Sequence, residues 1–193
     1  MDRKTAWIGI SAILLITLLT AGYALFLRKP AFYGAAFDSP RQAAEIQAVD
    51  MYGNAFRLSD SRGKIVLLYF GYVHCPLECP LTMAHLKQVL GSLGAEAQDV
   101  QVVMISTDPQ RDTSEAMRGF LAHFDPSFIG ISDGPDALAK IYRDYHIVVL
   151  EGGETHSSFT YVIDRSGKLR LTFVPDSTPE DIAHDLKIIL AEN

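Results

Sequence analysis

The polar and apolar positions divide the chain into one long uncharged stretch and a remainder in which strand-like and helix-like segments alternate. The uncharged stretch runs for 22 residues, from Ala6 to Leu27. As an α-helix it would be about 33 Å long, which is enough to cross the hydrocarbon layer of a bilayer. Because the apolar core of a cleaved signal peptide is shorter, we expect one retained transmembrane helix.

The chain is therefore expected to have three parts: a membrane anchor at 1–27, a tether at 28–45 and a folded domain at 46–193. Two basic residues flank each side of the uncharged stretch. Since topology follows the excess of Lys and Arg on one side, these charges leave the orientation of the anchor undecided.

Within the domain, continuous apolar runs predict buried strands, and apolar residues at i, i+3 and i+4 predict helices. The expected strands lie at 46–49, 55–58, 64–71, 100–106, 147–150, 160–164 and 168–173. The expected helices lie at 80–93, 112–124, 136–145 and 178–190. A βαβ half followed by a β-hairpin and a helix is typical of a thioredoxin-like α/β fold, here with an added N-terminal β-hairpin.

Two helix starts carry recognisable signals. Asp112 precedes Glu115 by three residues, a capping-box-like spacing that predicts a helix beginning at Asp112. Thr178 and Pro179 open the last helix, with proline at its first position.

Composition and charge exclude several classes of protein. Of the 193 residues, 48% are hydrophobic and 21% are charged, so a packed core is feasible and wholesale disorder is not expected. The chain has 17 Lys and Arg against 23 Asp and Glu, which argues against a nucleic-acid-binding protein that contacts phosphates. Two cysteines are too few for a disulfide-stapled miniprotein.

Both cysteines, Cys75 and Cys79, fall between the expected central strand and the next helix. Ligands of open α/β sheets bind at this end of the strands. Pro80 does not fit a helix interior, so we expect the helix to begin there, with Cys79 at its N-terminus. The positive end of the helix dipole is then expected to favour the Cys79 thiolate.

The spacing of the cysteines is compatible with a disulfide, with two inert thiols or with a metal site. Pro76 and Pro80 restrict the backbone beside each sulfur, which favours a functional pair. Two thiolates suit Cu(I), Zn(II) or iron-sulfur chemistry but do not complete a site. The candidate third ligand is His156, in a polar loop directly before a strand, and a solvated histidine is the alternative interpretation.

Several motifs occur together in a characteristic order. They are the run Gly63–Tyr72, Cys75-Pro-x-x-Cys79-Pro, the segment Ser106–Thr113, His156-Ser-Ser, and Ile163-Asp-x-x-Gly167. With these motifs the chain resembles the Sco/SenC family of membrane-anchored, copper-binding, thioredoxin-fold assembly factors of cytochrome c oxidase.

The resemblance implies that Cys75 and Cys79 are the copper thiolates and that His156 is an imidazole ligand. Such a mixed donor set can hold Cu(I) or Cu(II). One position departs from the family's pattern, because Leu77 stands where the family usually has Asp directly after Cys-Pro. This change leaves the three ligands in place and bears on the support of the copper loop or on docking of the partner.

The function implied is that of a metallochaperone that delivers copper to the dinuclear copper site of cytochrome c oxidase. The alternative is an enzyme, a thiol-disulfide reductase in which Cys75 and Cys79 act on the cysteines of the same acceptor site. The expected partners are the copper-binding subunit of the oxidase, a thiol-reducing thioredoxin-like protein and the membrane.

The resemblance also implies a location, the inner (cytoplasmic) membrane, with a single span and with the domain in the periplasm. The segment Met1–Thr5 is too short for a mitochondrial transit peptide, so we expect a bacterial protein. In an oxidising compartment the cysteines would need reduction before Cu(I) could bind.

Four other polar residues near these motifs have structural interpretations. His74 is expected to point away from Cys75, because side chains alternate along an extended strand exit. Asp108, Arg111 and Asp112 belong to the resemblance, but their physical chemistry predicts a loop that caps the next helix and pairs its charges internally.

Overall fold

The computed structural model describes residues 7, 13–20, 32–153 and 158–192, and the chain divides into two compact units, Met1–Ala31 and Phe32–Asn193. In the first unit, residues 13–20 are helical and exposed. No helix within the described residues has the length and apolar character needed to cross a membrane. Residues 6, 8–12 and 21–27 of the expected span lie outside the described residues, so the transmembrane helix stays a prediction.

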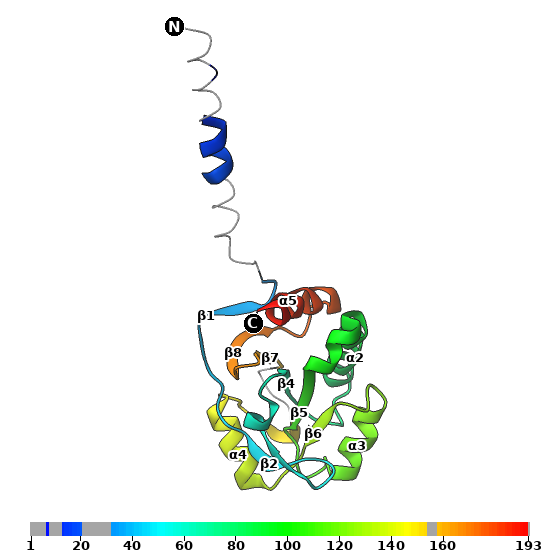
Figure 1. The fold of residues 1–193 in the computed structure, drawn as a ribbon. Coiled ribbons are helices and arrows are strands. Elements are labelled where there is room, and N and C mark those ends of the chain that lie inside the picture. Colours follow the sequence, from blue (N-terminus) through cyan, green and yellow to red (C-terminus); the bar gives the residue numbers. More distant parts are fainter. Residues whose placement is uncertain (1–6, 8–12, 21–31, 154–157, 193) are drawn as a thin grey trace. The chain divides into compact units, whose positions relative to one another are not determined.

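A mixed sheet organises the second unit (Figure 1). Within residues 32–153 and 158–192 it has six strands in the order β1-β8-β7-β4-β5-β6. Strands β4, β5 and β6 are parallel, whereas β7, β8 and β1 continue the sheet in antiparallel pairs. The strands are β1 Ala35–Gln42, β4 Ile65–Gly71, β5 Val100–Ser106, β6 Ile129–Ile131, β7 Thr160–Ile163 and β8 Lys168–Phe173.

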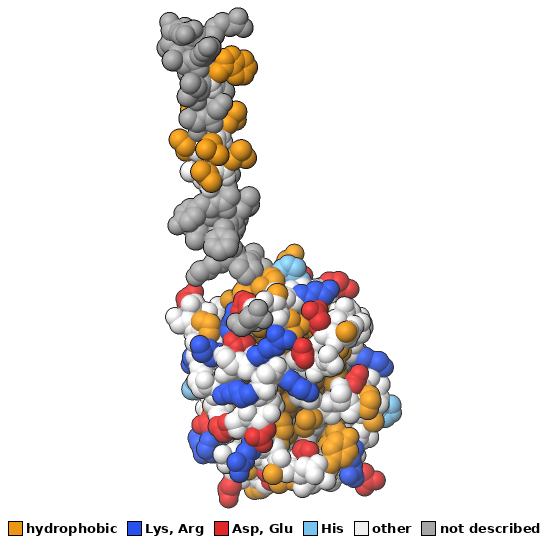
Figure 2. All heavy atoms as spheres, in the orientation of Figure 1, with side chains coloured by type: hydrophobic (Ala, Val, Ile, Leu, Met, Phe, Trp, Pro, Cys, Tyr) orange, Lys and Arg blue, Asp and Glu red, His pale blue; other side chains and the backbone are white. Residues whose placement is uncertain are grey.

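Helices and a hairpin cover the two faces of this sheet. Side chains of α2, α3 and α5 share one hydrophobic core, whereas α4 and the hairpin β2–β3 contribute to the other. The helices are α2 Glu78–Leu93, α3 Ser114–Ala122, α4 Pro135–Asp144 and α5 Pro179–Ala191, and the hairpin pairs β2 Gln47–Val49 with β3 Ala55–Arg57. Figure 2 shows acidic and basic side chains interspersed over the visible face of this unit.

Strand β4 lies inside the sheet, and all seven of its residues are buried. Ile65, Leu67 and Tyr69 belong to the core under α2 and α5, and the alternate residues Val66, Leu68 and Phe70 belong to the core under α4. Because successive side chains of a strand point to opposite faces, a strand covered on both sides must be apolar throughout. The prediction of a central strand from this run is confirmed.

Most of the predicted elements agree with the structure to within about two residues. The α/β class, the N-terminal hairpin, the strands at 100–106, 160–164 and 168–173, and all four helices are confirmed. Thr178 caps α5 by accepting the N–H of Asp181, with Pro179 at the first helical position.

The expected tether is partly wrong, because residues 35–42 form the edge strand β1, which pairs with β8. The compact unit begins at Phe32. Seven of the eight β1 residues are exposed, so the apolar pattern of a strand is missing from the sequence. In addition, the backbone N–H groups of Tyr33 and Gly34 donate to the fully buried carboxylate of Asp185, at 3.1 and 2.8 Å, and join the start of the unit to α5.

Two other expectations need correction. Residues 147–150 form no named strand, and an unpredicted three-residue strand, β6, completes the sheet instead. The N-cap of α3 is Thr113, whose hydroxyl accepts the N–H of Ala116 at 3.2 Å. Asp112 does not cap the helix, because its side chain is fully buried and is bonded to other groups.

Candidate metal centre

The loop from β4 to α2 holds both cysteines at the carboxyl end of the central strand. The N–H of Cys75 donates to the carbonyl of Tyr72 at 3.3 Å, which closes a turn. Helix α2 then begins at Glu78, so Cys79 is in its first turn, and Pro80 occupies a position that needs no intrahelical N–H bond. The predicted helix start is confirmed to within two residues.

Cys79 is a free thiol that lies 3% exposed in the core. The hydroxyl of Tyr69 donates to its Sγ at 3.5 Å. Burial, together with the neighbouring Cys75 sulfur, raises the pKa of Cys79 to about 12. A metal ion or a partner must therefore displace the Cys79 proton at neutral pH.

Gly71 allows this close packing around the sulfur of Cys79. A Cβ at position 71 would lie 2.8 Å from the Cys79 Sγ and 2.6 Å from Cε1 of Tyr69. Both distances are shorter than van der Waals contact, so only glycine permits the end of β4 to pass this close to the thiol.

Cys75 is also a free thiol, and it is partly exposed. Its Sγ accepts the backbone N–H of Cys79 at 3.3 Å. Burial opposes the thiolate of Cys75, but the backbone N–H groups of Cys79, Leu77 and Glu78 outweigh it, so the pKa of Cys75 is lowered. The prediction that the helix N-terminus favours the Cys79 thiolate is wrong, because the first-turn N–H groups face the sulfur of Cys75.

Leu77 is the N-cap of α2, and its side chain accepts no hydrogen bond from the first turn. The side chain is 68% exposed. An Asp at an N-cap normally accepts one of the free N–H groups. In this chain the sulfur of Cys75 takes that role for the N–H of Cys79.

A buried carboxylate supports the cysteine loop from below. The N–H of Val73 donates to both oxygens of Asp112, at 3.1 and 3.2 Å, and the hydroxyl of Ser106 donates to Oδ2 at 2.6 Å. Burial raises the pKa of Asp112, although these donors and His74 oppose the rise. His74 is exposed, with its Nδ1 3.6 Å from Oδ1 of Asp112, as expected of a histidine that packs on the loop.

A second loop lies beside the cysteines, at the helical turn Glu151–Gly153. Thr107 Oγ1 donates to the carbonyl of Gly153 at 2.6 Å, and Arg111 donates to the carbonyl of Gly152 at 2.8 Å. Gly153 has φ +87, and a Cβ there would lie 2.7 Å from Cβ of Asp108, so the position requires glycine. The charges of Asp108 and Arg111 pair with each other, as the sequence predicted.

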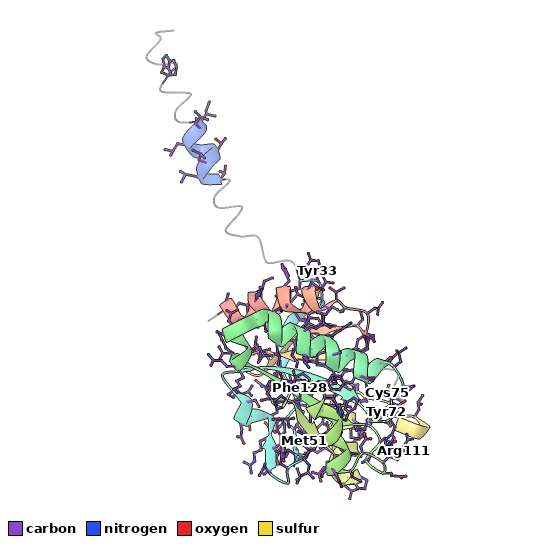
Figure 3. All side chains as sticks on the ribbon, turned by 90° about the vertical axis from the view of Figure 1, so that its right-hand side faces the viewer. Tyr33, Met51, Tyr72, Cys75, Arg111 and Phe128 are labelled. Carbon is purple, nitrogen blue, oxygen red and sulfur yellow. The ribbon has the colours of Figure 1, made fainter. Side chains whose placement is uncertain are left out.

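The two loops and the end of β4 line an open cavity of about 330 Å³. Both cysteines line it, together with Leu77, Gly153 and Ser158. Figure 3 shows Cys75, Tyr72 and Arg111 at the same end of the domain. Ser158 also bridges the two loops, because its hydroxyl donates to Oε2 of Glu78 at 2.8 Å.

His156, the expected third ligand, lies outside the described residues. Within the described part of the chain, no group of three or more His, Cys, Asp and Glu side chains could hold a metal ion. The structure thus brings Cys75 and Cys79 together and leaves the role of His156 a prediction.

Sequence reasoning missed the polar contacts of Tyr69 and Thr107. Tyr69 belongs to an apolar run whose pattern specifies burial but not the sulfur that its hydroxyl contacts. Thr107 is part of the motif at Ser106–Thr113, so the motif marked the segment without showing what it contacts.

Comparison with known proteins identifies the family of this domain. A sequence profile described as SCO1/SenC matches residues 36–191. The chain belongs to the SCO1/SenC family. The resemblance drawn from the motifs is therefore confirmed.

Individual SCO1/SenC relatives agree with this assignment. A SCO2-like protein from Rickettsia felis is 30% identical over 159 residues, which cover 78% of each chain. The structure of Bradyrhizobium japonicum ScoI with copper bound is 34% identical, with a TM-score of 0.67, and the match covers 77% of this chain and 99% of that one. BsSco, described as having a disulfide switch, is a member of the Sco family of cytochrome c oxidase assembly proteins. It is 21% identical, with a TM-score of 0.68 over 82% of this chain and 99% of its own, which shows the shared fold.

These relatives bear on three of the predictions. The Sco structures confirm the thioredoxin-like α/β fold. The expectation of copper as the metal agrees with the copper bound to the Bradyrhizobium protein, and the association with cytochrome c oxidase assembly agrees with the description of the family.

Proposed function

We propose that this protein is a copper chaperone that delivers copper to the dinuclear copper site of cytochrome c oxidase. The observation that carries the proposal is the pair of free thiols, Cys75 and Cys79, on one cavity at the carboxyl end of β4. Soft thiolate ligands suit Cu(I), and copper is the metal bound to the ScoI relative.

The two thiols have complementary properties for holding a metal ion as cargo. Cys75 is partly exposed and has a lowered pKa, so its thiolate is available to an incoming ion. Cys79 is buried and must give up a proton when it binds. Copper uptake is therefore expected to release protons and to weaken as the pH falls.

We propose His156 as the third ligand. Gly153 and Ser158, which flank residues 154–157, both line the cavity of the cysteines, and this supports the assignment. Ser158 is two residues from His156, a separation that an extended backbone spans with about 7 Å at most. The hydrogen bond from Ser158 to Glu78 adds support, because Glu78 adjoins Cys79 in α2.

We also propose that the uncharged segment from Ala6 to Leu27 anchors the domain in the inner membrane, with the domain in the periplasm. The support is the length of the segment and the chemistry of the site. A tether in the membrane plane would raise the encounter rate with a membrane-bound acceptor. A thioredoxin-like reductant would keep the cysteines reduced.

The test is a copper titration of the reduced full-length protein in detergent, beside the variants Cys75→Ala, Cys79→Ala and His156→Ala. We expect one copper per chain. Each substitution should weaken copper binding more than about 100-fold, because loss of a ligand should exceed the 10- to 100-fold loss of affinity that is typical of residues that only orient a ligand. Tight binding that survives loss of either cysteine would reject the proposal.

A second candidate, a thiol-disulfide reductase, is favoured by the difference between the two thiols. The Cys75 thiolate would attack a disulfide of the acceptor and form a mixed disulfide, releasing one acceptor thiolate. Cys79, once deprotonated, would attack the Cys75 sulfur and release the second. Two electrons would thereby pass to the acceptor, leaving a disulfide between Cys75 and Cys79.

His156→Ala separates the two candidates. Copper binding requires the imidazole, whereas thiol-disulfide exchange between two cysteines does not. A His156→Ala variant that reduces an acceptor disulfide at the normal rate but no longer transfers copper would show that both activities reside in the site. Loss of neither activity would exclude His156 from the site.

A further inference from the structure

The segment Thr107–Asp112, between β5 and α3, contacts both loops of the candidate metal centre. Its backbone begins beside the cysteine loop, where the N–H of Thr107 donates to the carbonyl of Gly71 at 2.8 Å. It also turns back on itself, because the N–H of Asp112 donates to the carbonyl of Asp108 at 2.9 Å. A short, internally bonded segment thus lies between two loops that are distant in the sequence.

On the cysteine side, the segment acts through Asp112. Its carboxylate is fully buried and accepts the N–H of Val73, two residues before Cys75. The Ser106 hydroxyl, at the end of β5, donates to Oδ2 of Asp112, so the carboxylate is also fixed to the sheet. A buried charge with these donors has little freedom to move, and it restrains the loop at Val73.

On the other side, the segment acts through Arg111 and Thr107. Arg111 donates to the carbonyl of Gly152 while its Nε pairs with Asp108. The buried hydrogen bond from Thr107 Oγ1 to the carbonyl of Gly153 holds the next residue. These bonds restrain the chain directly before residues 154–157.

We propose that Arg111 and Asp112 are positioning residues for copper, with separate targets. Asp112 positions the cysteine loop. Arg111 positions the Gly152–Gly153 turn and, through it, His156, the proposed third ligand. This inference rests on the proposed copper binding. Residues that orient metal ligands typically change metal affinity 10- to 100-fold when they are substituted.

The first test is a copper titration of the full-length protein carrying Arg111→Met or Asp112→Asn, each in the native and in the His156→Ala background. We expect Arg111→Met to weaken copper binding about 10-fold in the native background and to have no further effect after His156→Ala. Asp112→Asn should weaken binding about 10-fold in both backgrounds, because its target is the cysteine loop.

The matched control is Arg165→Met. Arg165 also pairs with a carboxylate, Asp99, and donates to a backbone carbonyl, that of Leu190, but its partners do not line the cavity. Its loss should leave copper binding unchanged. The proposal fails if Arg111→Met has no larger effect than Arg165→Met, or has the same effect with and without His156.

The second test needs no metal and separates this inference from the proposed function. Hydrogen exchange of the metal-free protein should become about 10-fold faster at Gly152 and Gly153 in Arg111→Met, and at Val73 in Asp112→Asn. If the native protein binds no copper, the proposed function fails. The exchange rates then decide by themselves whether Arg111 and Asp112 hold the two loops. Unchanged exchange at both loops in these variants would overturn the positioning roles of both residues.

Asp112→Asn could disturb folding, because the carboxylate is buried. Ser106→Ala is the second variant for that case, since it removes one donor to the carboxylate and keeps the carboxylate itself. It should speed exchange at Val73 by a smaller factor than Asp112→Asn does, and by more than at Gly152, which it reaches only indirectly because the hydroxyl also accepts the N–H of Asp108, the partner of Arg111. Equal acceleration at both loops would show a general loss of structure and count against separate targets.

Discussion

The two ends of the central strand β4 carry the same kinds of polar residue and use them differently. At the amino end, Arg165 pairs with Asp99, and Arg170 pairs with both Asp164 and Glu192. Each of these cations pairs with a nearby carboxylate, and the backbone that Arg165 also holds, the carbonyl of Leu190, belongs to α5 and lies away from the cavity.

At the carboxyl end of β4, Arg111 likewise pairs with Asp108, but the polar side chains there also hold the backbone of the two loops beside the cavity. Asp112 accepts the N–H of Val73, and Arg111 donates to the carbonyl of Gly152. Both free cysteines line that cavity, and Cys75 is the more exposed of the two. The difference teaches that a site arises where polar groups support loops, whereas paired charges contribute mainly stability.

The largest expected effect is a difference in reactivity between the two cysteines at the carboxyl end of β4. At neutral pH we expect iodoacetamide to modify Cys75 about 100 to 1000 times faster than Cys79, whose pKa is raised to about 12 by burial. The rate at Cys75 should stay high above its lowered pKa and fall as the pH drops through that value, because the thiolate becomes protonated. Mass spectrometry of quenched samples measures both rates, and equal rates would contradict the assignment.

The next effect concerns the close packing at the end of β4. Gly71→Ala should destabilise the fold by about 1–3 kcal/mol and weaken copper binding, since the added Cβ would meet Tyr69 and the Cys79 sulfur. Urea unfolding and copper titration measure the two changes.

The control is Gly91→Ala in the same helix as Cys79, where an added Cβ meets nothing within 4 Å. It should stabilise the protein by up to about 1 kcal/mol, because alanine favours the helix more than glycine does. If Gly71→Ala behaves like Gly91→Ala, the tight contact with the thiol does not exist.

At the opposite end of β4, Arg170→Met should cost about 1–2 kcal/mol at neutral pH and leave copper binding unchanged within about twofold. Burial disfavours the Asp164 carboxylate, but the N–H of Lys168, the hydroxyl of Ser166 and Arg170 outweigh it and lower the pKa of Asp164. This stabilisation is present above the unfolded pKa of about 3.9 and is lost as the pH falls through the lower folded pKa.

Unfolding measured from pH 7 to pH 2 tests the role of Arg170. The difference in stability between the native protein and Arg170→Met should shrink below about pH 4, as Asp164 takes up a proton. A loss of copper affinity in Arg170→Met would break the distinction between the two ends of the strand.

The smallest expected effect comes from replacing Leu77, the N-cap of α2, with a residue whose side chain can cap the helix. Leu77→Asp should stabilise α2 by up to about 1 kcal/mol, since its carboxylate is a stronger acceptor for the N–H of Cys79 than the Cys75 sulfur is, while Pro80 has no N–H to donate. The same negative charge should raise the pKa of Cys75, which moves the midpoint of its alkylation profile to higher pH.

Leu77→Asn separates capping from charge, because the amide can cap the helix without repelling the thiolate. It should reproduce the gain in stability with a smaller shift of the Cys75 profile. An unchanged profile in Leu77→Asp would show that the first-turn N–H groups do not control the acidity of Cys75.

The sequence predicted the interior of the domain better than its edges. The apolar run at β4 was sufficient to predict a central strand, because burial on two faces requires apolar residues throughout. The spacing of apolar residues was sufficient to predict the four helices. The edge strand β1 and the short strand β6 were missed, because an exposed strand and a three-residue strand carry little pattern.

The residues of the sequence determined by themselves which chemistry the protein could carry: two thiols four residues apart, beside a proline, after a buried strand. The tertiary structure alone decided which thiol is acidic, because the pKa depends on burial and on the direction of the first-turn N–H groups. It also decided that Asp112 supports the cysteine loop rather than capping α3, since Val73 is 39 residues away along the chain and only folding brings the two together.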